Sequence, residues 1–152
     1  SYMHFNIQPD IVSTAKGLGG GLPIGACLMG EKVQYVLGPG DHGSTYGGNP
    51  VCCAGALSVL QRLDEEFLAE VRAKSAYVFA ELSGAEGVEA VTGLGLMIGI
   101  KTVKPAREVL NICMEQGVLC LTAKDKVRLL PALNIPMEQL KKAVAVIKEA
   151  VK

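Results

Sequence analysis

Lys16 is the residue of this sequence best placed for covalent chemistry. It follows the apolar segment 9–15 and precedes a glycine-rich run, and no acidic residue adjoins it. Removal of water from an amine at such a strand end would favour its neutral form, a nucleophile able to form a Schiff base with a carbonyl. The alternative is a solvated lysine at the mouth of a loop, which performs no chemistry.

Hydroxyl side chains precede the expected start of a helix in residues 42–50. Ser44 and Thr45 come just before a glycine pair and the dipeptide Asn49-Pro50, which has the chemistry of a helix N-cap and first turn. Hydroxyls and free helix N–H groups can together bind an anion such as phosphate. The alternative is a plain loop, in which Asn49 caps the helix and both hydroxyls face solvent.

Two other patterns in the same region predict less. Gly38, Gly40 and Gly43 match the dinucleotide fingerprint in form, but Pro39 occupies the tight turn and no helix is expected at the third glycine. A nucleotide-binding domain is therefore kept only as a distant alternative. His42 has no second His or Cys at metal-ligand spacing, so no metal site is expected.

Arg128 stands on a short apolar strand that ends at Pro131. An arginine among apolar neighbours needs an anionic partner, because an unpaired charge is costly to remove from water. A bidentate contact with a ligand carboxylate is one interpretation. A structural ion pair with the protein's own acidic residues is the other.

The composition narrows the classes of function. The chain has 152 residues and a net charge of zero, and its scattered basic residues argue against nucleic-acid binding. The longest uncharged stretch, 42–61, contains Asn49, Pro50 and a glycine pair, so it predicts no membrane span. The start shows no signal peptide, and five cysteines without paired spacing favour buried, reduced thiols in a cytoplasmic protein.

The pattern of apolar residues predicts an α/β fold. Residues 9–15 are expected to form a short buried strand and 26–29 a second strand, on either side of a glycine loop at 17–25. One helix is expected from Asn49 to about Leu82. The remaining strands and helices are predicted over 88–100, 105–116, 118–122, 126–130 and 136–151.

Four segments, taken in order, resemble the class III pyridoxal-phosphate-dependent aminotransferases. They are PDIVSTAKGLGGGLPIGA, HGSTYGGNPVCCAGALSVL, GLGLMIGI and GVLCLTAKDKVRLLPAL, and the resemblance covers essentially the whole chain. Enzymes of the acetylornithine type are the most similar, followed by the ornithine type. The resemblance implies a fold-type I enzyme, with the C-terminal portion of the large cofactor-binding domain in 1–62 and the small C-terminal domain in 63–152.

The resemblance also implies a role for each candidate residue. Lys16 matches the lysine that binds pyridoxal 5'-phosphate and shuttles a proton during the reaction. Thr45, with Ser44 beside it, matches the position that binds the cofactor phosphate of the neighbouring subunit in a homodimer. Arg128 matches the arginine that binds the carboxylate of the amino acid or 2-oxo acid.

The implied reaction moves an amino group from N-acetylornithine, or a related ω-amino donor, to 2-oxoglutarate in arginine biosynthesis. Thr92 stands where the family commonly has arginine, and Tyr46 where it more often has phenylalanine. Other family residues that contact the cofactor would lie upstream of Ser1, so a fragment that is inactive alone is expected. The alternatives are an ornithine or other class III ω-aminotransferase, and a non-catalytic stand-alone interaction module.

Overall fold

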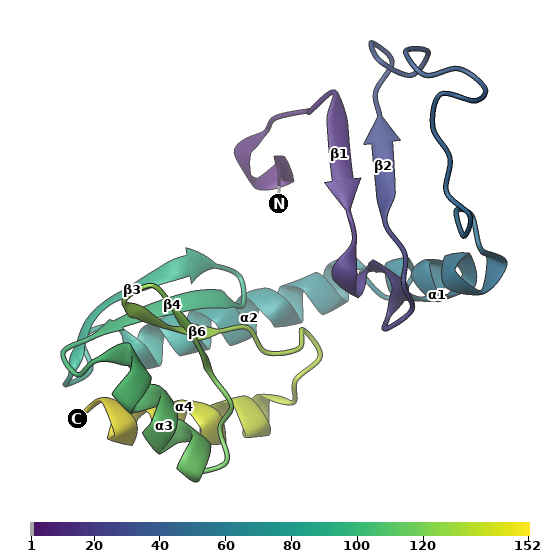
Figure 1. The fold of residues 1–152 in the computed structure, drawn as a ribbon. Coiled ribbons are helices and arrows are strands. Elements are labelled where there is room, and N and C mark those ends of the chain that lie inside the picture. Colours follow the sequence, from purple (N-terminus) through teal and green to yellow (C-terminus); the bar gives the residue numbers. More distant parts are fainter. Residues whose placement is uncertain (1) are drawn as a thin grey trace. The chain divides into compact units, whose positions relative to one another are not determined.

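The computed structural model describes residues 2–152, which form two units, one ending at Asp64 and the other running from Glu65 to Lys152 (Figure 1). The sequence predicted the boundary after Arg62. No helix in the described part of the chain is long and apolar enough to cross a membrane.

The first unit is built on a two-stranded antiparallel sheet. Strand β1 (Ile11–Thr14) pairs with β2 (Ala26–Met29), and Val12 lies opposite Leu28. Short 3-10 helices at Tyr2–Phe5 (η1) and Lys16–Gly19 (η2) flank β1, and helix α1 (Pro50–Leu60) ends the unit. The two strands were predicted, but the expectation that 9–15 is buried is wrong, because Ile11 and Ser13 are exposed.

The glycine run lets η2 and the residues after it lie directly against α1. A Cβ added to Gly55 of α1 would lie 2.7 Å from Leu22 Cδ1 and 3.0 Å from the carbonyl oxygen of Gly19. Gly20 has a positive φ of 62°, and its own added Cβ would lie 3.1 Å from Val59 Cγ2. The backbone of the glycine loop therefore packs closely against a helix of the same unit.

The long helix predicted from Asn49 to about Leu82 is wrong, because the chain forms two helices there. Helix α1 ends at Leu60, and α2 covers Glu65–Leu82. Two i→i+3 bonds tighten the end of α1, and Arg62 Nη1 donates to the Ser58 carbonyl at 2.7 Å. These contacts use the carbonyls that a continuing helix would need, and Glu65 and Glu66 favour a new N-terminus through the helix dipole.

A four-stranded antiparallel sheet with the order β3-β4-β6-β5 forms the second unit. Its strands are β3 (Val88–Leu94), β4 (Met97–Thr102), β5 (Leu121–Ala123) and β6 (Lys126–Leu129). The single strand predicted over 88–100 is wrong, because it folds into a hairpin. Gly93 and Gly95 have φ values of 145° and 58°, and a Cβ on Gly93 would lie 2.1 Å from the Met97 carbonyl oxygen.

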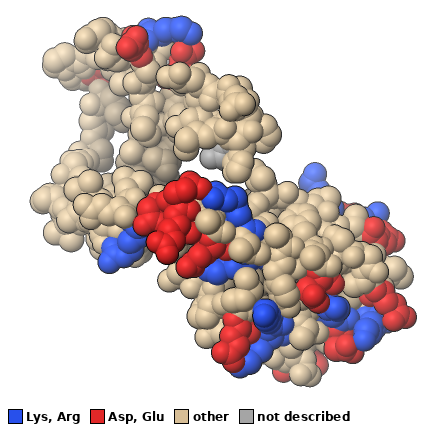
Figure 2. Space-filling view, turned by 180° about the vertical axis from the view of Figure 1, so that it is seen from behind, with Lys and Arg blue, Asp and Glu red and all other residues tan. Residues whose placement is uncertain are grey.

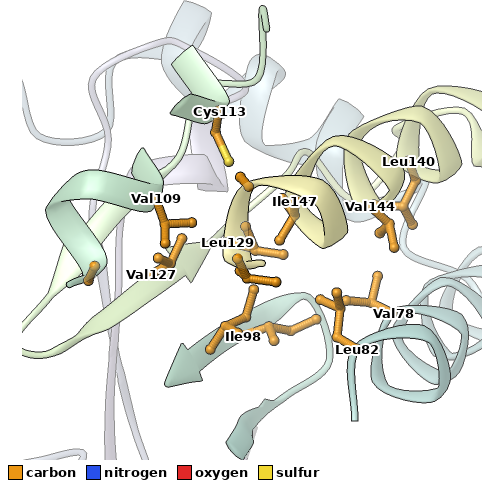
Figure 3. Packing of buried hydrophobic residues seen from close by; sticks show 14 residues of the cluster. Val78, Leu82, Ile98, Val109, Cys113, Val127, Leu129, Leu140, Val144 and Ile147 are labelled. Carbon is orange, nitrogen blue, oxygen red and sulfur yellow. The ribbon is translucent and has the colours of Figure 1, made fainter. Parts of the chain in front are cut away.

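Three helices pack on one face of this sheet and bury the main core (Figures 1 and 3). They are α2, α3 (Ala106–Glu115) and α4 (Met137–Val151), and the last two were predicted to within one residue at each end. Strands β4 and β6 contribute Ile98, Ile100, Val127 and Leu129 to the core. The helices contribute Val78, Leu82, Val109, Cys113, Leu140, Val144 and Ile147.

The five cysteines are free, but they are not all core residues as predicted. Cys113 is buried in the second unit, whereas Cys27 on β2 is exposed. Burial, and to a lesser extent the neighbouring Cys113 thiol, raise the pKa of Cys120 to about 12. Burial also raises the pKa of Cys113. Both thiols of this pair are therefore protonated near neutral pH, the form that reacts slowly.

Substitution of Gly55 by alanine tests the contact between the glycine loop and α1. Alanine favours the helix by about 1 kcal/mol, but overpacking against Gly19 and Leu22 costs about 1–3 kcal/mol. We expect a net loss of about 1 kcal/mol in the free energy of unfolding, measured by urea denaturation. Gly17→Ala is the matched control, because an added Cβ there meets nothing within 4 Å. A Gly55→Ala chain more stable than the parent would contradict this packing.

Thiol labelling tests the environment of the cysteines. At pH 8, iodoacetamide should modify Cys27 first, because the thiolate is the reactive form and Cys120 stays protonated there. Peptide mass spectrometry after timed quenching measures each site, and the chain unfolded in guanidinium, where all five sites react, is the control. Equal labelling rates at Cys120 and Cys27 in the folded chain would contradict the raised pKa of Cys120.

Candidate active site

Lys16 directly follows β1 and begins η2 with an unusual backbone conformation. Its φ is 56°, in the left-handed region that costs a residue with a side chain roughly 1–2 kcal/mol. Such strain is typical of positions where a side chain must point in a required direction. The conformation turns the chain out of β1 and into the glycine loop.

The side chain of Lys16 is exposed. Of the two interpretations of Lys16 from the sequence, a desolvated amine and a solvated lysine at the mouth of a loop, the described residues fit the second, because they do not cover the lysine. The next residue adds no obstruction, since a Cβ on Gly17 would meet nothing within 4 Å. An accessible primary amine fits a cofactor that carries a carbonyl group.

Ser44 and Thr45 lie in the irregular segment before α1, and both are exposed. Asn49 Oδ1 accepts hydrogen bonds from the backbone N–H groups of Val51 at 3.0 Å and Cys52 at 3.2 Å. The prediction that Asn49 caps the helix is confirmed, and its cap occupies two N–H groups that an anion would need. Within residues 2–152, the Ser44 and Thr45 hydroxyls have no hydrogen bond, so both are available to donate to phosphate oxygens.

The fingerprint of Gly38, Gly40 and Gly43 does not form the structure that binds dinucleotides. Residues 30–49, all of them described, contain neither a strand before these glycines nor a helix opening at Gly43. Instead, the Gly38 N–H donates to Asp41 Oδ2 at 2.7 Å in a local turn. The described part of the chain also places no three His, Cys, Asp or Glu side chains where they could hold a metal ion.

Arg128 lies in the middle of β6, opposite Gly99 of β4 and Leu121 of β5. Its neighbours Val127 and Leu129 point into the core, so its side chain leaves the other face of the sheet. It lines a cavity of about 870 Å³ together with residues of the 116–121 and 130–136 segments and of α4.

Among residues 2–152, the guanidinium of Arg128 has no hydrogen-bond or ion-pair partner. Its Nε is buried and makes no hydrogen bond, and no carboxylate among residues 2–152 forms an ion pair with it. The structural ion pair considered from the sequence is thus not formed within the described chain. The remaining donors are available to an anion in the cavity.

Thr92, a position where the resemblance implied arginine, contacts a positively charged side chain from another strand. Its Oγ1 accepts a hydrogen bond from Lys126 Nζ at 2.8 Å and lies 3.3 Å from the Gly99 carbonyl oxygen, to which it donates. Gly99 is also the residue opposite Arg128. Lys126 of β6 therefore places a cation next to Thr92 of β3.

The predicted site residues fall into both units. Lys16, Ser44 and Thr45 belong to the first, and Arg128 belongs to the second. One buried charge was missed: Lys74 of α2, which is only 5% exposed. Its spacing from Val71, Val78 and Leu82 places it on the buried face of α2, and this spacing could have identified it.

Comparison with known proteins decides the family. The family described as aminotransferase class-III matches residues 1–151 of the chain. The chain belongs to this family. The resemblance inferred from the sequence is confirmed.

Individual class III relatives extend the likeness to both sequence and structure. The acetylornithine aminotransferases of Haemophilus ducreyi and Clostridium acetobutylicum are 48% and 42% identical to the chain over 97% and 100% of its length. The acetylornithine aminotransferase structure from Elizabethkingia anophelis matches 99% of the chain, with 31% identity and a TM-score of 0.85. The predicted α/β fold of a fold-type I transferase is confirmed.

The chain spans about two-fifths of the length of these relatives. It covers 38% of the Haemophilus ducreyi protein, 41% of the Clostridium acetobutylicum protein and 41% of the Elizabethkingia anophelis structure. An ornithine aminotransferase structure from Toxoplasma gondii matches similarly, with a TM-score of 0.87 and 30% identity over 98% of the chain and 38% of its own.

Proposed function

We propose that this chain is the C-terminal portion of a pyridoxal 5'-phosphate-dependent aminotransferase. The enzyme would move an amino group from N-acetylornithine, or a related ω-amino donor, to 2-oxoglutarate in arginine biosynthesis. The names of the most similar sequence relatives support this donor. The observation that carries the proposal is the exposed amine of Lys16, held at a strand end in a strained backbone conformation.

Pyridoxal phosphate, when bound, supplies the electron sink that makes removal of a proton next to the amino group feasible. Lys16 would hold the cofactor through its amine and would move a proton to and from the substrate carbon. Thr45 and Ser44 would bind the cofactor phosphate of the neighbouring subunit. Arg128 would bind the substrate carboxylate with the guanidinium donors that the protein leaves unused.

The proposal assigns each unit a place in the enzyme. Residues 1–62 would end the large cofactor-binding domain, and 63–152 would form the small C-terminal domain. The exposed state of Lys16 is consistent with this assignment, since the remaining three-fifths of the relatives' length could supply the missing cover. The cytoplasmic location expected from the sequence stays a prediction.

Two other functions have support of their own. An ornithine aminotransferase is favoured by the structural likeness to the Toxoplasma gondii protein. A non-catalytic interaction module is favoured by the apolar surface of the first unit. The reading frame upstream of Ser1 distinguishes the interaction module from the enzyme. A frame that encodes the rest of the large domain supports the enzyme, and an initiator codon just before Ser1 supports the module.

Turnover tests the role of Lys16. The protein expressed from the complete reading frame should make glutamate from N-acetylornithine and 2-oxoglutarate, and Lys16→Ala should lower kcat by at least about 10²–10⁴-fold, because the base is lost. Borohydride reduction with pyridoxal phosphate should label Lys16, as read by peptide mass spectrometry. Lys32→Ala, an exposed lysine paired with Asp10, is the matched control. The 152-residue chain should show no turnover; full turnover by this chain would contradict its proposed status as a portion.

Self-association tests the proposed homodimer. Charged residues are sparse in the first unit, and Figure 2 shows neutral residues over nearly all of its visible surface. The exposed large side chains include Ile11, Leu28, Tyr35, Val36, Tyr46 and Leu57. A soluble monomer seldom leaves so much apolar surface in contact with water.

Sedimentation at micromolar concentration should therefore find dimers or larger species, and Val36→Lys should weaken them. Val103→Lys in the second unit is the control, since Val103 is 71% exposed and Val36 is 70% exposed. A parent chain that stays monomeric would argue against the homodimer.

A further inference from the structure

We propose that Lys74 is a positioning residue for Arg128, through the segment 130–136 that it holds in place. The inference rests on the proposed function, in which Arg128 binds the substrate carboxylate. Lys74 is not among the residues that line the Arg128 cavity, so its effect would pass through the protein backbone.

Lys74 is a buried ammonium with a specific partner. It lies on the core-facing side of α2, and its side chain is 7% exposed. Its Nζ donates to the Leu133 carbonyl oxygen at 3.0 Å and lies 3.5 Å from Glu70 Oε2. A lysine is seldom buried to this extent, because removing its charge from water costs free energy that only good hydrogen bonds offset.

Leu133 belongs to the segment that joins β6 to α4. Leu129, the last residue of β6, follows Arg128, and the segment begins directly after it. Residues of the segment form one wall of the Arg128 cavity. The wall consists of Leu130, Pro131, Ala132, Asn134 and Ile135.

The segment is fixed at its ends by backbone hydrogen bonds. The Leu129 end pairs with Ile98 in the sheet, and the Pro136 carbonyl accepts from the Leu140 N–H at 3.0 Å in α4. Within residues 2–152, the middle of the segment accepts one hydrogen bond from a side chain, and Lys74 donates it. Loss of this bond removes the Lys74 donor from the Leu133 carbonyl and leaves the middle of the segment without that side-chain contact, so the wall is free to shift.

A shifted wall changes how the carboxylate meets Arg128. The backbone of β6 runs without interruption into the segment, so a movement at Leu133 is transmitted to the cavity that Arg128 lines. Displacements of about 1 Å away from the reacting atoms can lower rates by up to 10²-fold. The effect should fall on substrates with an α-carboxylate and spare those without one.

The test uses the enzyme expressed from the complete reading frame. The kcat/KM for N-acetylornithine is divided by that for its analogue without the α-carboxylate, and the same ratio is measured for Lys74→Met. We expect this preference to fall roughly 10-fold, within the range of small misplacements of a binding group. A purely structural role would lower both rates together and leave the ratio unchanged.

Three further measurements complete the design. Glu70→Gln removes the ion pair but leaves the bond to Leu133, so it should keep the wild-type ratio. Hydrogen exchange should accelerate in the peptide covering 130–136 of the folded Lys74→Met protein. If that variant does not fold, Lys74→Gln, which is too short to reach Leu133, takes its place in the same comparison.

The two proposals fail in different ways. A wild-type enzyme that makes no glutamate contradicts the proposed function, and the positioning role with it. An active wild-type enzyme whose Lys74 variants keep the full carboxylate preference contradicts the positioning role alone.

Discussion

Alternation of side chains along β6 is the constraint on which the second unit depends. Val127 and Leu129 must enter the core beneath the three helices, and a strand directs every second side chain to the opposite face. Arg128 is therefore forced outward between them, where Gly99 stands opposite. The same apolar contacts that stabilise the sheet thus fix a cation on its open face. Replacement of the core residues would disturb Arg128 without touching it.

The first unit depends on close backbone contact instead of side-chain burial. Only Gly19 and Ala56 of its described residues are buried, and the glycine loop reaches α1 because Gly55 has no side chain. This contact places the loop that starts at Lys16 against the helix capped by Asn49. The glycines of this loop allow its backbone to pack against α1 within the same unit.

Prediction from the sequence succeeded where a local pattern determines the structure. The helices α3 and α4 followed from apolar periodicity with proline and glycine at their ends, and the Asn49 cap followed from side-chain chemistry. It failed where the chain reverses without an interruption in apolar character, as at Gly93 to Gly95 and at the break after Leu60. Lys16, Arg128 and Thr45 were predicted as site residues from the order of motifs, and their roles stay predictions. Lys74 was missed although its spacing places it on the buried face of α2, and its partner Leu133 lies too far away in the sequence to be predicted.

The small sheet of the first unit consists entirely of edges. Within residues 2–152 this sheet has two strands, so each of them pairs on one side and presents its remaining backbone N–H and C=O groups on the other. Two strands alone are marginally stable in water, and such open rows accept any further strand, native or not. The order in which the chain is made then matters: whatever strand reaches β1 or β2 first determines whether this unit extends a proper sheet or begins an aggregate.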